Sequence, residues 1–454
     1  MKPKRIIALG LSLLLLLLSF AGCEKTPDRV ENSEPVEGPS LADLKETDSL
    51  VIYTYTGNVP HQPRINQFSA LYDVDVEVVR VDGHISEYTE RVMNDLASGS
   101  GPDVLFVDDL YSSDIAKIAL NGSLLDLTNI LAEDPEFSEE DYVEGVFEAG
   151  QFNGRQYVIP LAFEAPISLS STEKLNEIGF NWADIDTTAD FAESISRLTP
   201  AAEQTPGFAQ MLDSQNHFSQ LLITSGVTLI DYETGEVLPD EEGLREFLEG
   251  YKEYFSYDYN ETGRIYLSNQ GHYQLMSGEW VFWLPTDASY LAQSISVMNS
   301  ESCDYTVHLI PSQTGETVAN IRGGAMAIRA NTENSLNAYN FIKFMLSEDA
   351  QSDENLNFDY YPIHKEAIRN VVYETPAMKP VNGFDVIDSE NPALSDEEAE
   401  MLIEMLTGID RFVLGLPVMS TMVQESMLPY FQDEKSYEEC FDDLKSKLTF
   451  YLSE

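Results

Sequence analysis

Apolar and polar residues follow regular patterns in the N-terminal third of the chain, and these patterns predict a parallel sheet. Residues 50–55, LVIYTY, have the pattern of a buried strand, and residues 74–78, VDVEV, alternate with period two. Residues 101–107, GPDVLFV, read as a turn followed by a strand. Between the second and third strands, apolar residues recur at a helical spacing, at Tyr88, Val92 and Leu96. This alternation of strands and helices predicts an α/β fold whose parallel sheet is flanked by helices.

The N-terminus has the pattern of an export signal. Three basic residues among the first five precede an apolar run from Ile6 to Ala21, which stops at Gly22-Cys23. The run is shorter than the ~20 apolar residues that a transmembrane helix needs, and it ends in small residues. Residues 19–23, SFAGC, resemble a bacterial lipoprotein signal, in which the cysteine is lipidated. We therefore expect residues 1–22 to be a signal peptide and Cys23 to anchor the protein on the extracytoplasmic side of the cell membrane. The alternative is a retained membrane helix.

The segment after Cys23 is polar and acidic. Residues 24–40 hold three prolines and four glutamates and almost no apolar residues. Such a composition cannot bury enough surface to fold, so residues 23–45 are predicted to be a flexible acidic tether. The whole chain carries 26 Lys and Arg against 78 Asp and Glu, a formal net charge of −52. This charge repels nucleic acid and anionic membrane surfaces, and it argues against both as partners.

Cysteine and histidine residues give no signal for a metal site. The sequence contains no CxxC or HExxH motif, and its six histidines are scattered. We therefore expect neither a bound metal nor a cofactor. Besides Cys23 there are two cysteines, Cys303 and Cys440, and the sequence leaves open whether they are bonded, because spacing alone does not place their Cα atoms.

The chain beyond the tether is too long for one hydrophobic core and predicts two lobes. One stretch, residues 375–397, is rich in Pro, Asn, Asp and Ser, and it is predicted to be a loop or an insertion.

Several segments together resemble the extracellular solute-binding proteins of ABC importers, in the carbohydrate-type family that includes maltose-binding protein. The segments span roughly residues 48–370. They are SGPDVLFVDD (100–109), NGSLLDLTNIL (121–131), FNGRQYVIPLAFEAPISL (152–169), MSGEWVFW (276–283), RGGAMAI (322–328) and AYNFIKFMLSEDAQ (338–351). The C-terminal eighty residues match only in helical character.

The resemblance implies a periplasmic-binding-protein fold, in which two α/β lobes enclose a ligand cleft and are joined by crossing segments. It divides the chain into lobe 1 (46–163 plus about 322–375) and lobe 2 (about 164–321 plus 376–454). The expected crossing segments are Ala162–Pro166, the region near Val318–Ile321, and residues near 370–376. Ligands of open α/β sheets bind at the carboxyl ends of strands.

The function that the resemblance implies is carbohydrate capture without catalysis. The protein would bind a sugar, in particular an oligosaccharide, and deliver it to the permease subunits of an ABC transporter, acting as a monomer. Sugars present C–H faces that pack on aromatic rings, and hydroxyl rims that carboxylates and amides bind.

Trp280 and Trp283 are the first candidates for such an aromatic contact. Residues 280–284 are expected to be extended, and residues three apart in a strand point to opposite faces. At most one of the two tryptophans therefore faces the cleft. By resemblance to the family this is Trp280, and Trp283 is expected in the core.

Glu164 is the principal acidic candidate, because it lies in the apolar segment IPLAFEAPISL, where a buried charge needs a partner. The resemblance implies that it accepts sugar hydroxyls. The alternative is an internal ion pair with a cation such as Arg322. The other ligand-binding candidates are polar or aromatic residues at strand exits or in matching family positions: Asn58, Asp108, Asp109, Tyr111, Gln215 and His217. Two adjacent tyrosines, Tyr360 and Tyr361, are expected to pack rather than bind.

Three alternatives remain at this point. A ferric-ion-binding protein would use tyrosines with acidic partners, and FDYYP (358–362) is the segment that would serve it. An exported glycoside hydrolase or lyase would use Asp108, Asp109 or Glu164 as a carboxylate pair. A sensor accessory would present its ligand to a receptor kinase.

Overall fold

The computed structural model describes residues 38–55, 61–110, 115–197, 214–261, 273, 275–276, 282–284, 288–352, 360–381, 384–415 and 417–453. From Pro39 onward the chain forms one compact unit. The predicted signal peptide and Cys23 lie outside the described residues.

The last residues of the predicted tether contact the folded unit. Leu41–Asp43 form a 3-10 helix, η1. The backbone N–H of Lys45 donates to Ser335 Oγ at 2.8 Å, and the Lys45 ammonium pairs with Glu333 at the same distance. Residues 41–45 are therefore held against the body of the protein.

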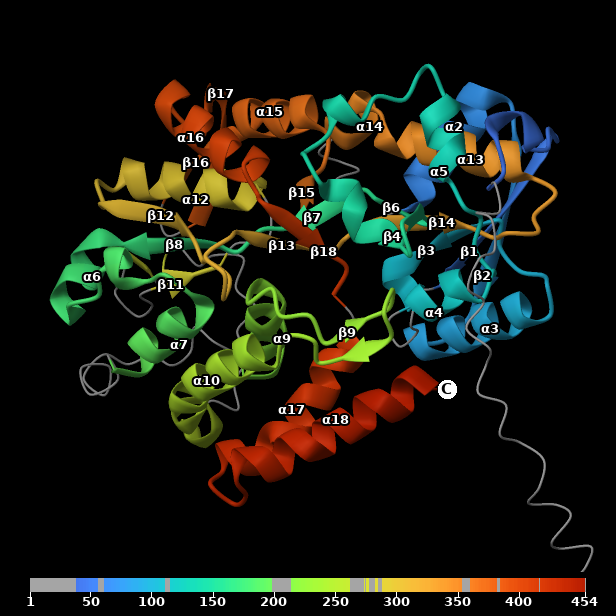
Figure 1. The fold of residues 1–454 in the computed structure, drawn as a ribbon. Coiled ribbons are helices and arrows are strands. Elements are labelled where there is room, and N and C mark those ends of the chain that lie inside the picture. Colours follow the sequence, from blue (N-terminus) through green and yellow to red (C-terminus); the bar gives the residue numbers. More distant parts are fainter. Residues whose placement is uncertain are drawn as a thin grey trace, which may run out of the picture. The chain divides into compact units, whose positions relative to one another are not determined.

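A five-stranded sheet organises the N-terminal part of the unit (Figure 1). Its strands, in spatial order, are β2 (Asp75–Val81), β1 (Ser49–Tyr55), β3 (Val104–Phe106), β14 (Ala325–Ile328) and β6 (Val158–Pro160). β1 pairs in parallel with β2 and with β3, which confirms the parallel sheet that the sequence predicted. β14 is antiparallel to both of its neighbours.

Helices pack around this sheet through the apolar faces that the sequence indicated. The helices are α2 (His61–Tyr72), α3 (Ile85–Ala97), α4 (Ile115–Leu120), α5 (Thr128–Glu133), α13 (Ser335–Leu346) and α14 (Glu348–Ser352). On α3, the predicted face is buried: Tyr88, Val92 and Leu96 are at most 8% exposed. α2 and α13 meet through the rings of Phe68 and Phe341, whose centroids lie 5.0 Å apart.

A second, three-stranded sheet has β8 (Ile167–Ser171) between β11 (Phe282–Trp283) and β12 (Tyr305–Leu309), both antiparallel to it. An aromatic core forms beside it, where the Phe282 ring lies 4.8 Å from Phe180 and 5.5 Å from Phe191. The remaining helices are α6 (Thr172–Ile178), α7 (Thr188–Arg197), α9 (Ser214–Thr224), α10 (Glu241–Glu261), α12 (Ala288–Ser300), α15 (Lys365–Glu374), α16 (Asp396–Thr407), α17 (Pro417–Phe431) and α18 (Tyr437–Ser453).

A four-stranded sheet joins these two regions, and we call it the hinge sheet. Its order is β15 (Tyr361–Pro362), β7 (Ala162–Glu164), β13 (Val318–Ile321) and β18 (Arg411–Val413). The chain passes from the five-stranded sheet through β7 to β8, and it returns from β12 through β13 to β14. Two antiparallel strands in contact thus carry the chain between the two sheets.

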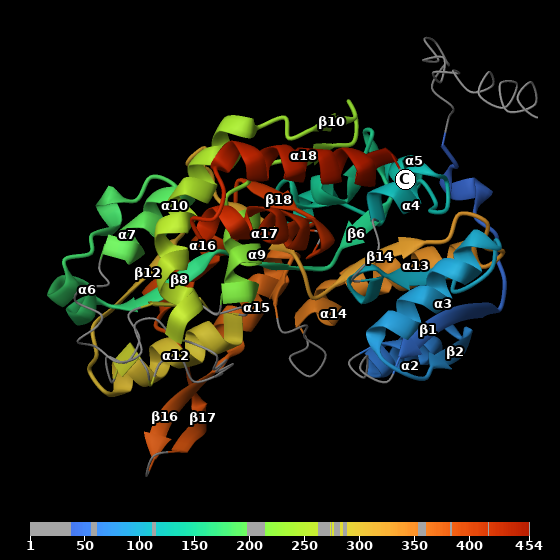
Figure 2. The ribbon, with the colours of Figure 1, turned by 90° about the horizontal axis from the view of Figure 1, so that it is seen from below.

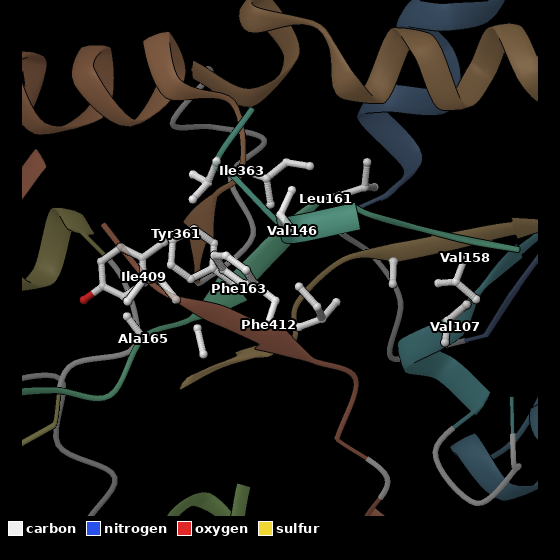
Figure 3. Close-up of a cluster of buried hydrophobic side chains, with 14 of the residues drawn as sticks. Val107, Val146, Val158, Leu161, Phe163, Ala165, Tyr361, Ile363, Ile409 and Phe412 are labelled. Atoms are coloured by element: carbon white, nitrogen blue, oxygen red, sulfur yellow. The ribbon is translucent and has the colours of Figure 1, made fainter. Parts of the chain in front are cut away.

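Aromatic side chains from the strands of the hinge sheet pack against one another (Figure 3). The Phe163 ring lies 5.6 Å from Tyr361 and meets Phe412 edge-on at 5.2 Å. Tyr361 is fully buried, as the sequence predicted. Such close packing of large rings fixes the relative positions of β7, β15 and β18.

The stretch 375–397, for which the sequence left a loop or an insertion open, is not a loop. It contains the hairpin of β16 (Pro376–Val381) and β17 (Phe384–Pro392), followed by the start of α16. Figure 2 shows the hairpin extending away from the rest of the ribbon. A two-stranded hairpin has only edge strands, so prolines that would interrupt a central strand are tolerated in it.

Short elements complete the fold. They are the pairs β4 (Gln151–Phe152) with β5 (Arg155–Gln156) and β9 (Ile230–Asp231) with β10 (Glu236–Val237), and the 3-10 helices η2 (Val107–Leu110), η3 (Glu139–Asp141), η4 (Val146–Gly150) and η5 (Trp182–Asp184). Among the helices that the structure describes, none combines the length and the apolar content needed to cross a membrane.

Candidate functional site

A small hollow lies beside the hinge sheet. Its lining comes from three places: the end of β7, one side of α9 and the end of β13. The lining residues are Glu164, Ala165, Pro166, Ser219, Gln220, Ile223, Thr224, Asn320 and Arg322. The wall thus combines a carboxylate, a guanidinium, two amides and two hydroxyls, and we call this hollow the hinge pocket.

Glu164 supplies the carboxylate, and the hinge sheet positions it. Its backbone pairs with Asn320 of β13, and the preceding residue, Phe163, is anchored in the aromatic interior. The Glu164 side chain is only 6% exposed. A charge buried to this extent is stable only if hydrogen bonds compensate for the lost water.

Two side chains provide that compensation. Gln220 donates from Nε2 to Glu164 Oε1 at 3.1 Å, and Arg322 donates from a terminal guanidinium nitrogen to Glu164 Oε2 at 3.3 Å. Among the described residues, each carboxylate oxygen therefore has one hydrogen-bond donor. Since each oxygen can accept about two hydrogen bonds, the carboxylate keeps further capacity to accept.

Gln220 reaches the pocket because α9 is fixed to the hinge sheet. Arg411 of β18 donates to the carbonyl of Gly226, just after α9, at 2.8 Å. The backbone N–H of Gln313 donates to the carbonyl of Ser225 at 2.9 Å. At the other side, Phe218 packs fully buried against α10. These contacts hold the helix so that its Gln220 side chain meets Glu164.

Arg322 is the accessible member of the ion pair. It follows β13, its backbone N–H donates to the carbonyl of Ala162 at 3.3 Å, and its side chain is 53% exposed. The pair therefore joins a buried carboxylate to a guanidinium that stays in contact with solvent. This is the internal ion pair that the sequence analysis kept as the alternative role of Glu164.

The hinge pocket offers donors and acceptors close together. Glu164 accepts, Arg322 donates, and amides and hydroxyls do both. Among the described lining residues, Glu164 is the single carboxylate. The described residues contain no group of three or more His, Cys, Asp or Glu side chains placed to hold a metal ion.

Of the predicted ligand-binding residues, Glu164 is the one whose side chain the structure describes. Three candidates lie outside the described residues: Asn58, Tyr111 and Trp280. Four others are placed by their backbone alone. Asp108 and Asp109 lie in η2, directly after β3, and Gln215 and His217 lie in α9.

Gln220 was missed by sequence reasoning. Glutamine in a helix has no distinctive pattern, so no signal in the sequence pointed to Gln220. Trp283, which was expected in the core, is half-buried and packs against the core, and its neighbour Phe282 lies within the core at 1% exposure. In a strand these two residues face opposite sides, so the inward position belongs to Phe282.

The two cysteines that the sequence left open are not bonded to each other. Cys440 is buried in α18 and Cys303 is half-buried before β12, and both are free thiols.

A model of the family described as bacterial extracellular solute-binding protein matches residues 64–380. No curated protein matches the chain.

Solved structures match over nearly the whole chain at low identity. The sugar-binding protein MalE from Xanthomonas citri is 14% identical with a TM-score of 0.63, and the match covers 89% of this chain and 97% of that one. The ABC transporter associated binding protein from B. animalis subsp. lactis Bl-04, in complex with beta-1,6-galactobiose, is 17% identical with a TM-score of 0.55, covering 90% and 98%. The GacH receptor of Streptomyces glaucescens, solved with acarbose, is 16% identical with a TM-score of 0.56, covering 90% and 100%. These likenesses confirm the two-lobed fold that the sequence predicted.

Proposed function

The chain belongs to the bacterial extracellular solute-binding proteins, and on that basis we propose that it captures a carbohydrate, in particular an oligosaccharide, and delivers it to the permease of an ABC importer. The observation that carries the proposal is the hinge pocket, where the buried Glu164 carboxylate lies between Gln220 and the half-exposed Arg322. A sugar hydroxyl donates one hydrogen bond and accepts others, so it suits a wall that offers a carboxylate beside a guanidinium and amides. Hydrogen bonds to charged groups are worth about 1.5–3 kcal/mol each.

Structurally similar proteins support this ligand class. Those with related folds were solved with beta-1,6-galactobiose, acarbose and cycloalternan. Trp280, Asp108, Asp109, Tyr111, Asn58, Gln215 and His217 remain our proposed further contacts to the sugar.

We propose that the protein binds without catalysis. A glycoside hydrolase needs two carboxyl groups on either side of the scissile bond, about 5–9.5 Å apart. The described lining of the hinge pocket contributes Glu164 alone. A ferric-ion site in the segment FDYYP (358–362) is disfavoured as well. Tyr361 of that segment is fully buried in the hinge sheet.

The division into lobes and the mode of anchoring belong to the same proposal. Lobe 1 would comprise residues 46–163 and about 322–375, and lobe 2 about 164–321 and 376–454. In support, the five-stranded sheet draws its strands only from the first pair of ranges, and the three-stranded sheet only from the second. Lipidation at Cys23 would hold the protein at the outer side of the cell membrane as a monomer.

A thermal-shift screen of the purified protein tests the ligand class. The panel contains neutral oligosaccharides, ferric ion and amino acids. A ligand that binds only the folded protein adds about 2.7 kcal/mol of stability at 100 times its Kd. We expect the melting temperature to rise with one or more oligosaccharides. A rise with ferric ion or amino acids and none with oligosaccharides would refute the proposal.

A further inference from the structure

The hairpin of β16 and β17 has two outer edges, and that of β16 is closed. An outer edge of a sheet presents backbone N–H and C=O groups to which a further strand can pair. On β16, Ser296 of α12 occupies both groups of one residue: its Oγ accepts from the N–H of Met378 and donates to the Met378 carbonyl, each at 3.2 Å. Two residues further along, Pro380 has no N–H to offer. No further strand can therefore pair regularly along this edge.

The outer edge of β17 is open in the part of the hairpin that the structure describes. Met378 lies directly opposite Ile387 in the ladder. Residues opposed in an antiparallel ladder either exchange hydrogen bonds or both turn their backbone groups outward. Because those of Met378 turn to Ser296, the N–H and C=O of Ile387 point away from β16. Among the described strands, β17 pairs with β16 alone, and within Phe384–Pro392 the single proline is the last residue.

Apolar side chains surround this open edge. Val386 and Ile387 of β17 are 42% and 60% exposed, and Val381 of β16 is 40% exposed. Three large apolar side chains that contact water thus lie on one hairpin, which extends away from the rest of the ribbon (Figure 2). Exposed apolar residues that gather in one place mark a site of interaction.

Charge on β17 selects the kind of strand that can add to it. β17 holds Asp385, Asp388 and Glu390 and neither Lys nor Arg. Lys379 of β16 pairs with Asp388 at 2.9 Å and compensates one of these charges. Pairing of β17 strands from two copies would bring acidic side chains opposite one another, which destabilises a sheet, and each copy carries a formal net charge of −52. A second copy is thus disfavoured, and a strand that carries Lys or Arg is favoured.

We infer that the outer edge of β17 is a docking site for a partner protein, which adds an extended segment of alternating apolar and basic residues to the hairpin as a third strand. The backbone of that segment bonds to the outward N–H and C=O of Ile387, its apolar side chains pack on Val386 and Ile387, and its basic side chains lie beside the acidic residues of β17. β17 contributes no residue to the lining of the hinge pocket. The docking site is therefore separate from the proposed sugar site and does not depend on it.

Fluorescence anisotropy on the full chain, with labelled peptides as probes, tests the inference. The first probe alternates valine and lysine over the length of β17. The second has the same side chains, but alternate backbone amides are N-methylated, which removes the donors along one edge and leaves every charge in place. We expect wild type to bind the first probe at physiological salt and the second about tenfold or more weakly, because strand addition depends on backbone hydrogen bonds.

Two variants of Ile387 and one matched control locate the binding. Ile387→Pro removes an outward N–H that takes no part in the ladder with β16, and it should raise the Kd of the first probe about tenfold. Ile387→Lys keeps the backbone and sets a like charge against the probe, so it should raise the Kd about fivefold, and it keeps the test valid if the proline variant does not fold. Leu71 is 66% exposed on α2, and Leu71→Lys makes the same change in charge there. It should leave the Kd unchanged.

Sedimentation velocity distinguishes a partner protein from a second copy. We expect wild type to sediment as a monomer. A wild-type dimer that Ile387→Pro dissociates would assign the edge to a second copy and overturn the inference. Equal affinity for the two probes, binding that neither Ile387 variant weakens, or no binding of the first probe by wild type would overturn it as well. None of these outcomes alters the proposed capture of carbohydrate, which the thermal-shift screen tests separately.

Discussion

Replacing Glu164 by glutamine keeps the shape of the side chain and removes its charge. One amide oxygen remains to accept, so one of the two hydrogen bonds, from Gln220 or from Arg322, persists as a weaker contact. Breaking a fully buried ion pair costs about 3–5 kcal/mol, because the partner charge is stranded. Here the Arg322 side chain is 53% exposed, so water solvates the released guanidinium.

The expected cost is therefore smaller than for a buried pair. Charged hydrogen bonds exceed neutral ones by about 1 kcal/mol each, which gives about 1–2 kcal/mol for the two bonds of Glu164. If Glu164 also accepts from the sugar, Glu164→Gln weakens binding by a similar amount, which is about 5- to 30-fold in Kd. Urea unfolding followed by circular dichroism measures the first quantity, and calorimetric titration with an oligosaccharide measures the second.

Glu400→Gln is the control for this experiment. Glu400 pairs with Arg369 at 2.6 Å, but both side chains are well exposed and lie outside the hinge pocket. This variant should change neither stability nor affinity measurably. If Glu164→Gln lowered the free energy of unfolding by more than about 3 kcal/mol, this would contradict the view that water solvates the released Arg322 guanidinium. A loss of stability with unchanged affinity would remove Glu164 from the ligand site.

Three further predictions concern other parts of the chain. Asp103→Asn should cost about 3–5 kcal/mol in urea unfolding, because Asp103 is 1% exposed and its partner Arg329 only 13%; a loss below 1 kcal/mol would show that the pair is dispensable. Burial lowers the pKa of His308 below its ordinary value of 6.5, so the unfolded chain binds the proton more readily and the free energy of unfolding should decrease as pH falls below about 6.5. His308→Gln should make the decrease between pH 7 and 5 shallower, and an unchanged slope would assign it to other groups. Cys23→Ala should move the exported protein from the membrane fraction to the soluble one, whereas unchanged retention would indicate an uncleaved helix.

The parallel part of the fold could be predicted from the sequence because its patterns are local. Period-two alternation at residues 74–78 and the buried face of Tyr88, Val92 and Leu96 each report burial on one side of an element. The hairpin at 376–392 could not be predicted in this way, since its prolines and acidic residues match a loop and its pairing depends on tertiary context. The deeper burial of Phe282 relative to Trp283 could not be predicted for a similar reason, because alternation gives two faces of a strand and only the neighbouring elements decide which face is inside.

From the sequence, a site residue could be predicted only where its polarity differs from that of the residues around it. Glu164 is a charged residue in an apolar segment. Its side chain is buried and accepts a hydrogen bond from Gln220. Gln220 gave no such signal, because its role follows from how α9 is fixed to the hinge sheet.

Calorimetric titration of the purified protein with the oligosaccharide that stabilises it most is the most direct test of carbohydrate binding in the hinge pocket. The account predicts saturable binding of one sugar per chain, with a Kd raised about 5- to 30-fold by Glu164→Gln and unchanged by Glu400→Gln. Absence of binding heat for every oligosaccharide tested, or a Kd indifferent to Glu164→Gln, would contradict it.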